Sequence, residues 1–70
     1  MIEQLQQAVK DAARIRDESW VEETSTYSID LREACDKACE SVGFDLRATQ
    51  AVWLLLFCCW NDALSWAEGG

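Results

Sequence analysis

The chain has 70 residues and a mass of 7.9 kDa, and it carries 13 acidic residues, 6 basic residues and no histidine. Its net charge is −7, and so few basic residues argue against direct nucleic-acid binding, which needs clustered Lys and Arg. The absence of histidine excludes histidine-based catalysis and histidine-ligated metals. A chain of this length forms one domain, which we expect to be helical over residues 1–68 with a flexible tail at 69–70.

The first predicted helix covers residues 2–23. Apolar residues recur at helical spacing at Leu5, Ala8, Ala12 and Ile15. The far end of this helix is less favourable, because several acidic residues lie where the helix dipole prefers cations. These residues are Asp17, Glu18, Glu22 and Glu23. We therefore expect this end to fray or to bind a basic group.

The second predicted helix covers residues 28–42. Ser28 is a suitable N-cap, and Asp30 with Glu33 forms an alternative capping-box start. The apolar stripe of this helix consists mainly of Ala and Cys, so another helix can approach it closely. Gly43 follows the helix at the position where a left-handed residue ends many helices.

The third predicted helix covers residues 46–67, with Asp45 as its N-cap. The link between the second and third helices is short, which predicts an antiparallel helical hairpin in an all-α fold of three helices. The third helix is apolar on all sides over much of its length. A helix of this kind should be surrounded by protein, and two partner helices in one small chain cover only part of it.

One stripe of the third helix is therefore predicted to form an interface. It contains large apolar side chains, namely Trp53, Phe57, Trp60 and Leu64. Aromatic residues bury roughly 150–250 Å² each, so this stripe would leave an unusually large apolar patch in water. The simplest solution is self-association as a two-fold symmetric dimeric helical bundle. The alternative is a three-helix monomer in which both faces of the third helix belong to the core.

The four cysteines form the pairs Cys35-x-x-x-Cys39 and Cys58-Cys59. Neither spacing is typical of a structural zinc site, which usually includes a Cys pair separated by two residues on a turn. We expect Cys35 and Cys59 to be small core residues, and we expect no metal or other cofactor. A thiol-based metal or redox sensor remains a weaker alternative.

The sequence contains no catalytic motif. It has no Gly-rich phosphate loop and no nucleophile elbow, and its neighbouring carboxylates are adjacent rather than convergent. We therefore predict that the protein is not an enzyme and has no catalytic residues. The longest apolar run, residues 51–60, is too short for the roughly 20 residues of a membrane span. Without a secretory signal, we expect a cytoplasmic protein that does not bind membranes.

The acidic segment formed by the end of the first predicted helix and the connection after it is the predicted partner-binding surface. It combines carboxylates with interleaved aromatic residues, namely Asp17, Glu18, Trp20, Glu22, Glu23 and Tyr27. This composition predicts a small acidic protein that binds and inhibits or modulates a larger partner protein with a basic surface. Phage and mobile-element accessory proteins, including anti-defence inhibitors, often have this character, and some cover a nucleic-acid-binding surface.

Two alternatives remain open at this point. The acidic face can be a solvated surface that keeps a structural homo-oligomerisation module soluble. The two predicted surfaces can also exchange roles, so that the aromatic stripe of the third helix meets the partner.

Overall fold

The computed structural model describes residues 2–69, which contain four helices and a small two-stranded sheet. In chain order the elements are α1 (Ile2–Glu18), β1 (Trp20–Val21), β2 (Thr26–Tyr27), α2 (Leu31–Ser41), α3 (Leu46–Cys58) and α4 (Trp60–Ala67). The prediction of three helices is therefore wrong in two places. A short hairpin replaces the end of the first predicted helix, and the third predicted helix is divided into two.

The helix α1 ends at Glu18 and does not continue to residue 23. The Ser19 hydroxyl donates a hydrogen bond to the carbonyl oxygen of Arg16 at 2.6 Å, and the Ser19 N–H donates to the same oxygen at 3.1 Å. A Ser side chain that bonds the backbone in this way competes with continued helix. The acidic residues that follow are also unfavourable at a helix C-terminus. The helix therefore ends before Glu22 and Glu23, while Asp17 and Glu18 stay in its last turn.

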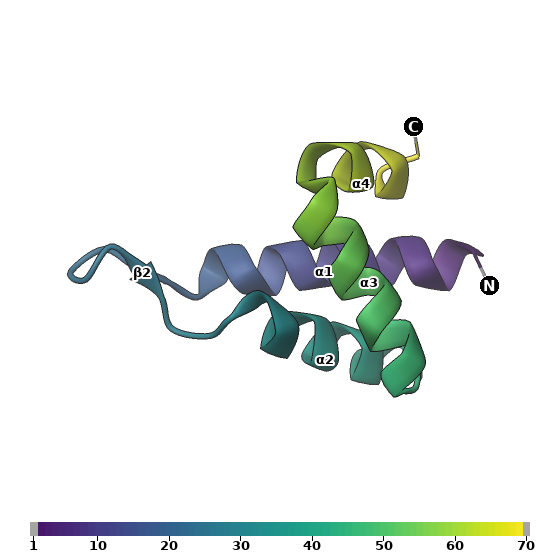
Figure 1. The fold of residues 1–70 in the computed structure, drawn as a ribbon, viewed down its shortest axis with the longest axis horizontal. Coiled ribbons are helices and arrows are strands. Elements are labelled where there is room, and N and C mark those ends of the chain that lie inside the picture. Colours follow the sequence, from purple (N-terminus) through teal and green to yellow (C-terminus); the bar gives the residue numbers. More distant parts are fainter. Residues whose placement is uncertain (1, 70) are drawn as a thin grey trace.

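The segment after α1 forms a β-hairpin, which we call the arm (residues 19–28). The strands β1 and β2 are antiparallel, with Trp20 opposite Tyr27 and Val21 opposite Thr26. The Ser28 N–H extends the ladder by donating to the Ser19 carbonyl oxygen at 2.8 Å. The arm extends beyond the helices at one end of the molecule (Figure 1). It therefore presents its side chains to solvent on a thin, protruding element.

The tip of the arm contains a strained residue. Ser25 has a positive φ of 54°, a conformation that costs a residue with a Cβ atom roughly 1–2 kcal/mol. We expect Ser25→Gly to stabilise the arm by up to about 1 kcal/mol, because glycine adopts this conformation without strain. Slower hydrogen exchange of the Ser28 amide would report the gain. Ser25→Val should have the opposite effect, and equal exchange rates in the two variants would contradict the prediction.

The helix α2 begins later than residue 28. Its N-cap is Asp30, whose carboxylate accepts a hydrogen bond from the Glu33 N–H at 2.8 Å. The alternative start at Asp30 is therefore the correct one. Gly43 has a φ of 83°, and the Phe44 N–H donates to the Cys39 carbonyl oxygen at 2.8 Å. The predicted left-handed end of this helix is confirmed.

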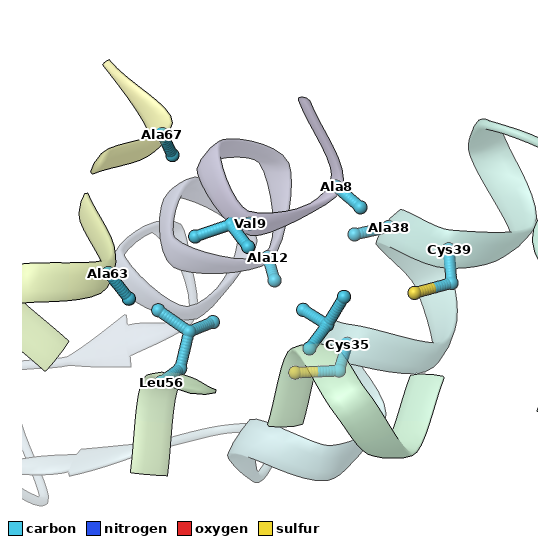
Figure 2. Packing of buried hydrophobic residues seen from close by; sticks show 10 residues of the cluster. Ala8, Val9, Ala12, Cys35, Ala38, Cys39, Leu56, Ala63 and Ala67 are labelled. Carbon is cyan, nitrogen blue, oxygen red and sulfur yellow. The ribbon is translucent and has the colours of Figure 1, made fainter. Parts of the chain in front are cut away.

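The pairing of the helices also differs from the prediction. The helices α1 and α2 lie side by side and run in opposite directions, whereas α3 crosses them steeply (Figure 1). The antiparallel partner of α2 is therefore α1, and the predicted antiparallel hairpin of residues 28–42 and 46–67 is wrong. Fully buried alanines on both helices, including Ala8 and Ala38, allow this close approach (Figure 2).

The predicted helix 46–67 is interrupted at Cys59. This residue has φ −143° and ψ 59°, which lie outside the helical region. Its N–H still donates to the Leu55 carbonyl oxygen at 3.0 Å, and its own carbonyl accepts from the Ala63 N–H at 2.7 Å. The interruption turns α4 back over α1, where Ala63 and Ala67 become buried (Figures 1 and 2). Tertiary packing thus compensates for the lost helical continuity.

The core lies where the four helices meet and consists mainly of small residues (Figure 2). Leu56 is the largest of the fully buried side chains and is 1% exposed. The other members of the buried cluster are Ala8, Val9, Ala12, Cys35, Ala38, Cys39, Val52, Ala63 and Ala67. Partly buried larger side chains, such as Trp60 and Trp66, surround this cluster.

Candidate partner-binding site

The cysteines occupy two different environments. Cys35 and Cys39 are fully buried, whereas Cys58 and Cys59 are exposed. The expectation that Cys59 belongs to the core is therefore wrong, because the turn between α3 and α4 moves it to the surface. Within residues 2–69, no group of three or more Cys, Asp or Glu side chains could hold a metal ion.

The buried thiols are poorly suited to metal or redox chemistry. Burial raises the pKa of Cys35 from 9.0 to about 12, and the neighbouring Cys39 and Asp36 add to this effect. Burial also raises the pKa of Cys39, although a hydrogen bond with Thr49 opposes the shift. Both groups therefore stay protonated at neutral pH, whereas the thiolate is the reactive and metal-binding form.

A hollow lies between the start of α1, the α2–α3 turn and the first half of α3. It has a volume of about 600 Å³ and is open to solvent. It is lined by Ile2, Gln4, Leu5, Gly43, Phe44, Asp45, Ala48 and Ala51. Asp45 is the only ionisable side chain in this lining, and it caps α3 by accepting hydrogen bonds from the N–H groups of Arg47 and Ala48. The hollow is thus a mostly apolar surface without convergent polar groups for catalysis.

The arm carries an exposed aromatic pair. Trp20 is 46% exposed and Tyr27 is 39% exposed, and their rings meet edge to face with centroids 5.0 Å apart. The guanidinium carbon of Arg16 lies 4.0 Å from the centroid of the Tyr27 ring. Tyr27 therefore contacts both Trp20 and Arg16. These two contacts fix the aromatic pair to the end of α1.

Two carboxylates lie at the tip of the arm, beside this aromatic pair. Glu22 and Glu23 are exposed residues of the turn between β1 and β2, and the Ser25 N–H closes this turn by donating to the Glu22 carbonyl oxygen at 3.2 Å. Among the described residues, neither glutamate forms an ion pair. The tip therefore carries negative charge that is not neutralised within residues 2–69.

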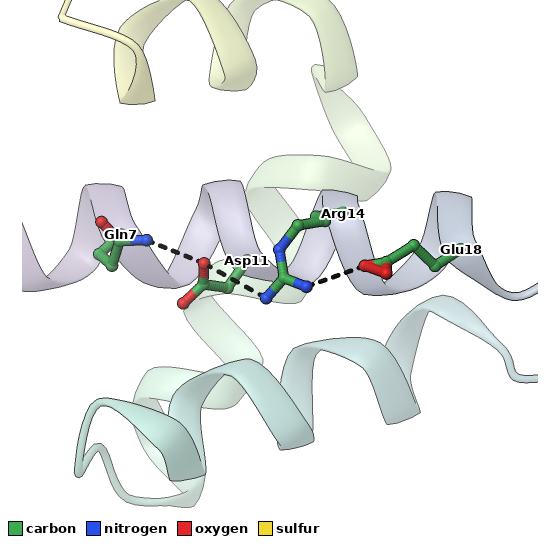
Figure 3. Close-up of polar contacts among 4 residues, drawn as sticks. All are labelled: Gln7, Asp11, Arg14 and Glu18. Carbon is green, nitrogen blue, oxygen red and sulfur yellow. Dashed lines mark hydrogen bonds and ion pairs between the residues drawn. The ribbon is translucent and has the colours of Figure 1, made fainter.

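The other two predicted acidic residues lie on the last turn of α1 rather than on the arm. Glu18 accepts a hydrogen bond from Arg14 at 2.8 Å, as part of a surface ladder that includes Gln7 and Asp11 (Figure 3). Asp17 borders a shallow hollow that reaches Leu64 of α4. Of the six predicted partner-binding residues, the structure thus brings Trp20, Glu22, Glu23 and Tyr27 together on the arm. Glu18 is already paired, and Asp17 borders a different surface.

The four residues predicted for self-association do not form one stripe. Trp53 and Phe57 stack on α3 with ring centroids 5.0 Å apart, and Phe57 is 66% exposed. Trp60 and Leu64 lie on α4, beyond the interruption at Cys59, and pack against the core. Trp53 also packs against the core, so Phe57 is the one exposed member of the predicted stripe among the described residues.

The sequence interpretation missed two groups of residues at these surfaces. Arg16 was not expected to contact the arm, because the predicted helix placed Tyr27 in a loop. Leu54 and Leu55 are exposed but were not assigned to an interface. The prediction assumed one continuous helix over residues 46–67 and assigned the interface to its aromatic stripe. A helical-wheel projection of residues 46–58 alone would have indicated the outward position of Leu54.

The comparisons with known proteins give no match: no family model fits the chain, and no curated protein or solved structure is significantly similar. Within residues 2–69, none of the helices is both long and apolar enough to cross a membrane.

Proposed function

We propose that this chain is a small non-catalytic protein that binds a basic surface of a larger partner protein through the arm. The observation that supports the proposal most strongly is the exposed Trp20–Tyr27 pair beside the unpaired carboxylates of Glu22 and Glu23. Exposed aromatic residues within a charged rim are typical of binding hot spots. A protruding hairpin can also enter a groove that a flat surface cannot reach.

The charge distribution favours a basic partner. Residues 17–31 include five acidic residues, Asp17, Glu18, Glu22, Glu23 and Asp30, and no basic residue. One of them, Glu18, is neutralised by Arg14, and another, Asp30, caps α2. Of the three that remain, Glu22 and Glu23 lie at the tip of the arm and Asp17 lies in the last turn of α1. Such a field attracts a positively charged surface and accelerates association with it.

The arm is also ordered in advance of binding. The Trp20 and Tyr27 rings pack against each other, and the guanidinium of Arg16, a residue of α1, packs on the Tyr27 ring. Fixing such side chains beforehand reduces the entropy that is lost on association. We infer that the arm binds as a preformed wedge. By occupying a basic groove, it would exclude the phosphates of nucleic acid from that groove, which makes an inhibitory role the favoured one.

An arginine-rich peptide provides a defined probe for this proposal. We expect it to bind the wild-type protein, with chemical shift changes at Trp20 and Tyr27 and with an affinity that falls as salt concentration rises. Trp20→Ala should weaken binding at least about tenfold, which corresponds to about 1.4 kcal/mol. The double variant Glu22→Gln/Glu23→Gln should also weaken it while leaving the fold intact, since both residues are exposed.

The matched control removes the same amount of charge elsewhere. Glu33 and Glu40 are exposed residues of α2, and Glu33→Gln/Glu40→Gln changes the net charge by the same amount as the arm variant. If the arm is the site, the control should retain most of the wild-type affinity. Equal weakening by the two double variants would mean that the peptide responds only to net charge, and the arm proposal would then be rejected.

A further inference from the structure

The outer face of α3 is apolar although solvent reaches it. Leu54 is 46% exposed, Leu55 is 37% exposed and Phe57 is 66% exposed, and Ala51 and Cys58 are exposed as well. Residues 51–58 are Ala, Val, Trp, Leu, Leu, Leu, Phe and Cys, so this part of the helix carries no charged side chain. We call the five exposed residues the α3 face. Contiguous exposed apolar patches commonly mark interaction sites on proteins.

The α3 face also lies in the one long segment without charge. Residues 48–61 contain no acidic and no basic residue, whereas the whole chain has a net charge of −7. Two copies of this chain repel each other, and like charges brought together at an interface cost several kcal/mol. The repulsion is smallest where neither copy carries charge. The charge distribution therefore selects the α3 face as the surface through which two copies can meet.

We propose that the α3 face binds a second copy of this chain in an antiparallel, two-fold symmetric arrangement centred near Leu54. This proposal is independent of the function proposed for the arm. The arm extends from the C-terminal end of α1 (Figure 1). A symmetric interface requires a self-complementary surface, and closed two-fold dimers are the commonest oligomers. The charge-free α3 face meets this requirement.

The antiparallel orientation follows from charge at the ends of α3. Arg47 is exposed in the first turn, on the helical line that continues through Ala51, Leu54 and Cys58. In a parallel pair the two Arg47 side chains and the two positive helix N-termini would lie together. In an antiparallel pair each Arg47 instead lies near the C-terminal end of the other α3, where the helix dipole favours a cation.

The sizes of the side chains are also complementary in this register. With Leu54 at the two-fold axis, the small Ala51 of one copy faces the region of the large Phe57 of the other. Pairing small with large side chains lets two helices pack without voids. The apolar hollow lined by Ile2, Ala48 and Ala51 adjoins one end of the face and enlarges the surface that a second copy can cover. A stable dimer generally buries about 800 Å² on each partner, more than one helical stripe alone supplies.

Sedimentation equilibrium and native mass spectrometry across the micromolar range would test this proposal. We expect the wild-type protein to reach twice the 7.9 kDa mass of one chain. Leu54→Glu should raise the dimer dissociation constant at least about a hundredfold, because it places two like charges at the axis. The matched control is Trp20→Glu, since Trp20 has the same exposed fraction as Leu54 but lies on the arm. That variant should remain dimeric.

Disulfide trapping would test the register. In the proposed arrangement Cys58 of one copy lies opposite residue 50 of the other, whereas the two Cys58 residues are offset by about 12 Å along the helices. Gln50→Cys in a Cys59→Ser background should therefore form a 50–58 cross-link between copies on mild oxidation. A Leu54→Glu addition should abolish the cross-link.

Two outcomes would overturn the inference. One is a wild-type protein that stays monomeric at the highest concentration measured, because the α3 face is then available for a different partner. The other is a dimer that persists in Leu54→Glu, because another surface then holds the copies together. Either result leaves the peptide-binding test of the arm unaffected, so failure of the dimer and failure of the proposed function can be distinguished.

Discussion

Replacing Leu56 with Ala is expected to lower the free energy of unfolding by about 2–5 kcal/mol. Leu56 is the largest fully buried side chain, and the residues around it are mostly Ala, Val and Cys, which cannot expand to fill the space. A chain of this length has a total stability of only about 4–10 kcal/mol. The variant should therefore be close to unfolding at room temperature, which urea denaturation followed by circular dichroism would measure.

The neighbouring Leu54 provides the control for this prediction. Leu54→Ala removes the same atoms from the same helix at a position that is 46% exposed. Its effect on the unfolding of the monomer should stay below about 1 kcal/mol, because little apolar surface is lost from the core. Measurement at low protein concentration keeps self-association from contributing. Similar losses in the two variants would show that α3 does not pack as described.

Alkaline pH is expected to destabilise the fold through Cys35. Its pKa is raised from 9.0 to about 12 in the folded protein, so between these values the unfolded chain loses a proton that the folded chain keeps. The stabilising contribution is complete below pH 9 and declines as pH rises toward 12. The free energy of unfolding should fall by at most about 1.4 kcal/mol per pH unit from this one group.

Unfolding measured between pH 8 and pH 11 in Cys35→Ala would isolate this contribution. The variant is less stable at neutral pH, but its stability should fall less steeply than that of the wild type above pH 9. Cys58→Ser is the control, because it removes an exposed thiol and keeps Cys35 intact. Parallel curves for the wild type and Cys35→Ala would contradict the burial of this thiol.

The two proposed surfaces lie on different parts of the molecule and use different physical forces. The arm presents aromatic rings and unpaired carboxylates at one end of the long axis, whereas the α3 face is uncharged. A dimer formed through the α3 face would carry two arms. Two arms on one particle can bind two basic sites of one partner with higher avidity than a single arm. Self-association and partner binding would then support each other.

The sequence was most informative at helix ends that are set by local interactions. Gly43 ends α2 through a left-handed turn, and Asp45 begins α3 by accepting hydrogen bonds from nearby N–H groups. Asp30 likewise caps α2 through the Glu33 N–H. Such features depend on the residue type and its immediate neighbours, so they can be recognised without knowledge of the fold.

The arm was only partly predictable. The aromatic and acidic residues that it carries could be selected from composition, but the hairpin itself gives a weak signal, because each strand has two residues and the turn lacks an Asn-Gly or Asp-Gly pair. The Trp20–Tyr27 contact and the stacking of Arg16 on Tyr27 help to stabilise it. Both contacts depend on the register of the hairpin, and the helical spacing of apolar residues does not reveal that register.

The sequence by itself determined the helical character of the chain, the end of α2 before Gly43, the start of α3 after Asp45 and the lack of charge over residues 48–61. For the start of α2 it offered both Ser28 and Asp30, and the structure decided for Asp30. Only the tertiary structure decided that the helix after Asp45 is interrupted at Cys59, where neither Gly nor Pro is present. A continuous helix would carry Ala63 and Ala67 away from α1. The interruption buries both residues on α1 and lets the Gln6 side chain donate to the Trp66 carbonyl oxygen at 2.9 Å. The gain comes from contacts between residues about 60 positions apart, and such contacts leave no local pattern in the sequence.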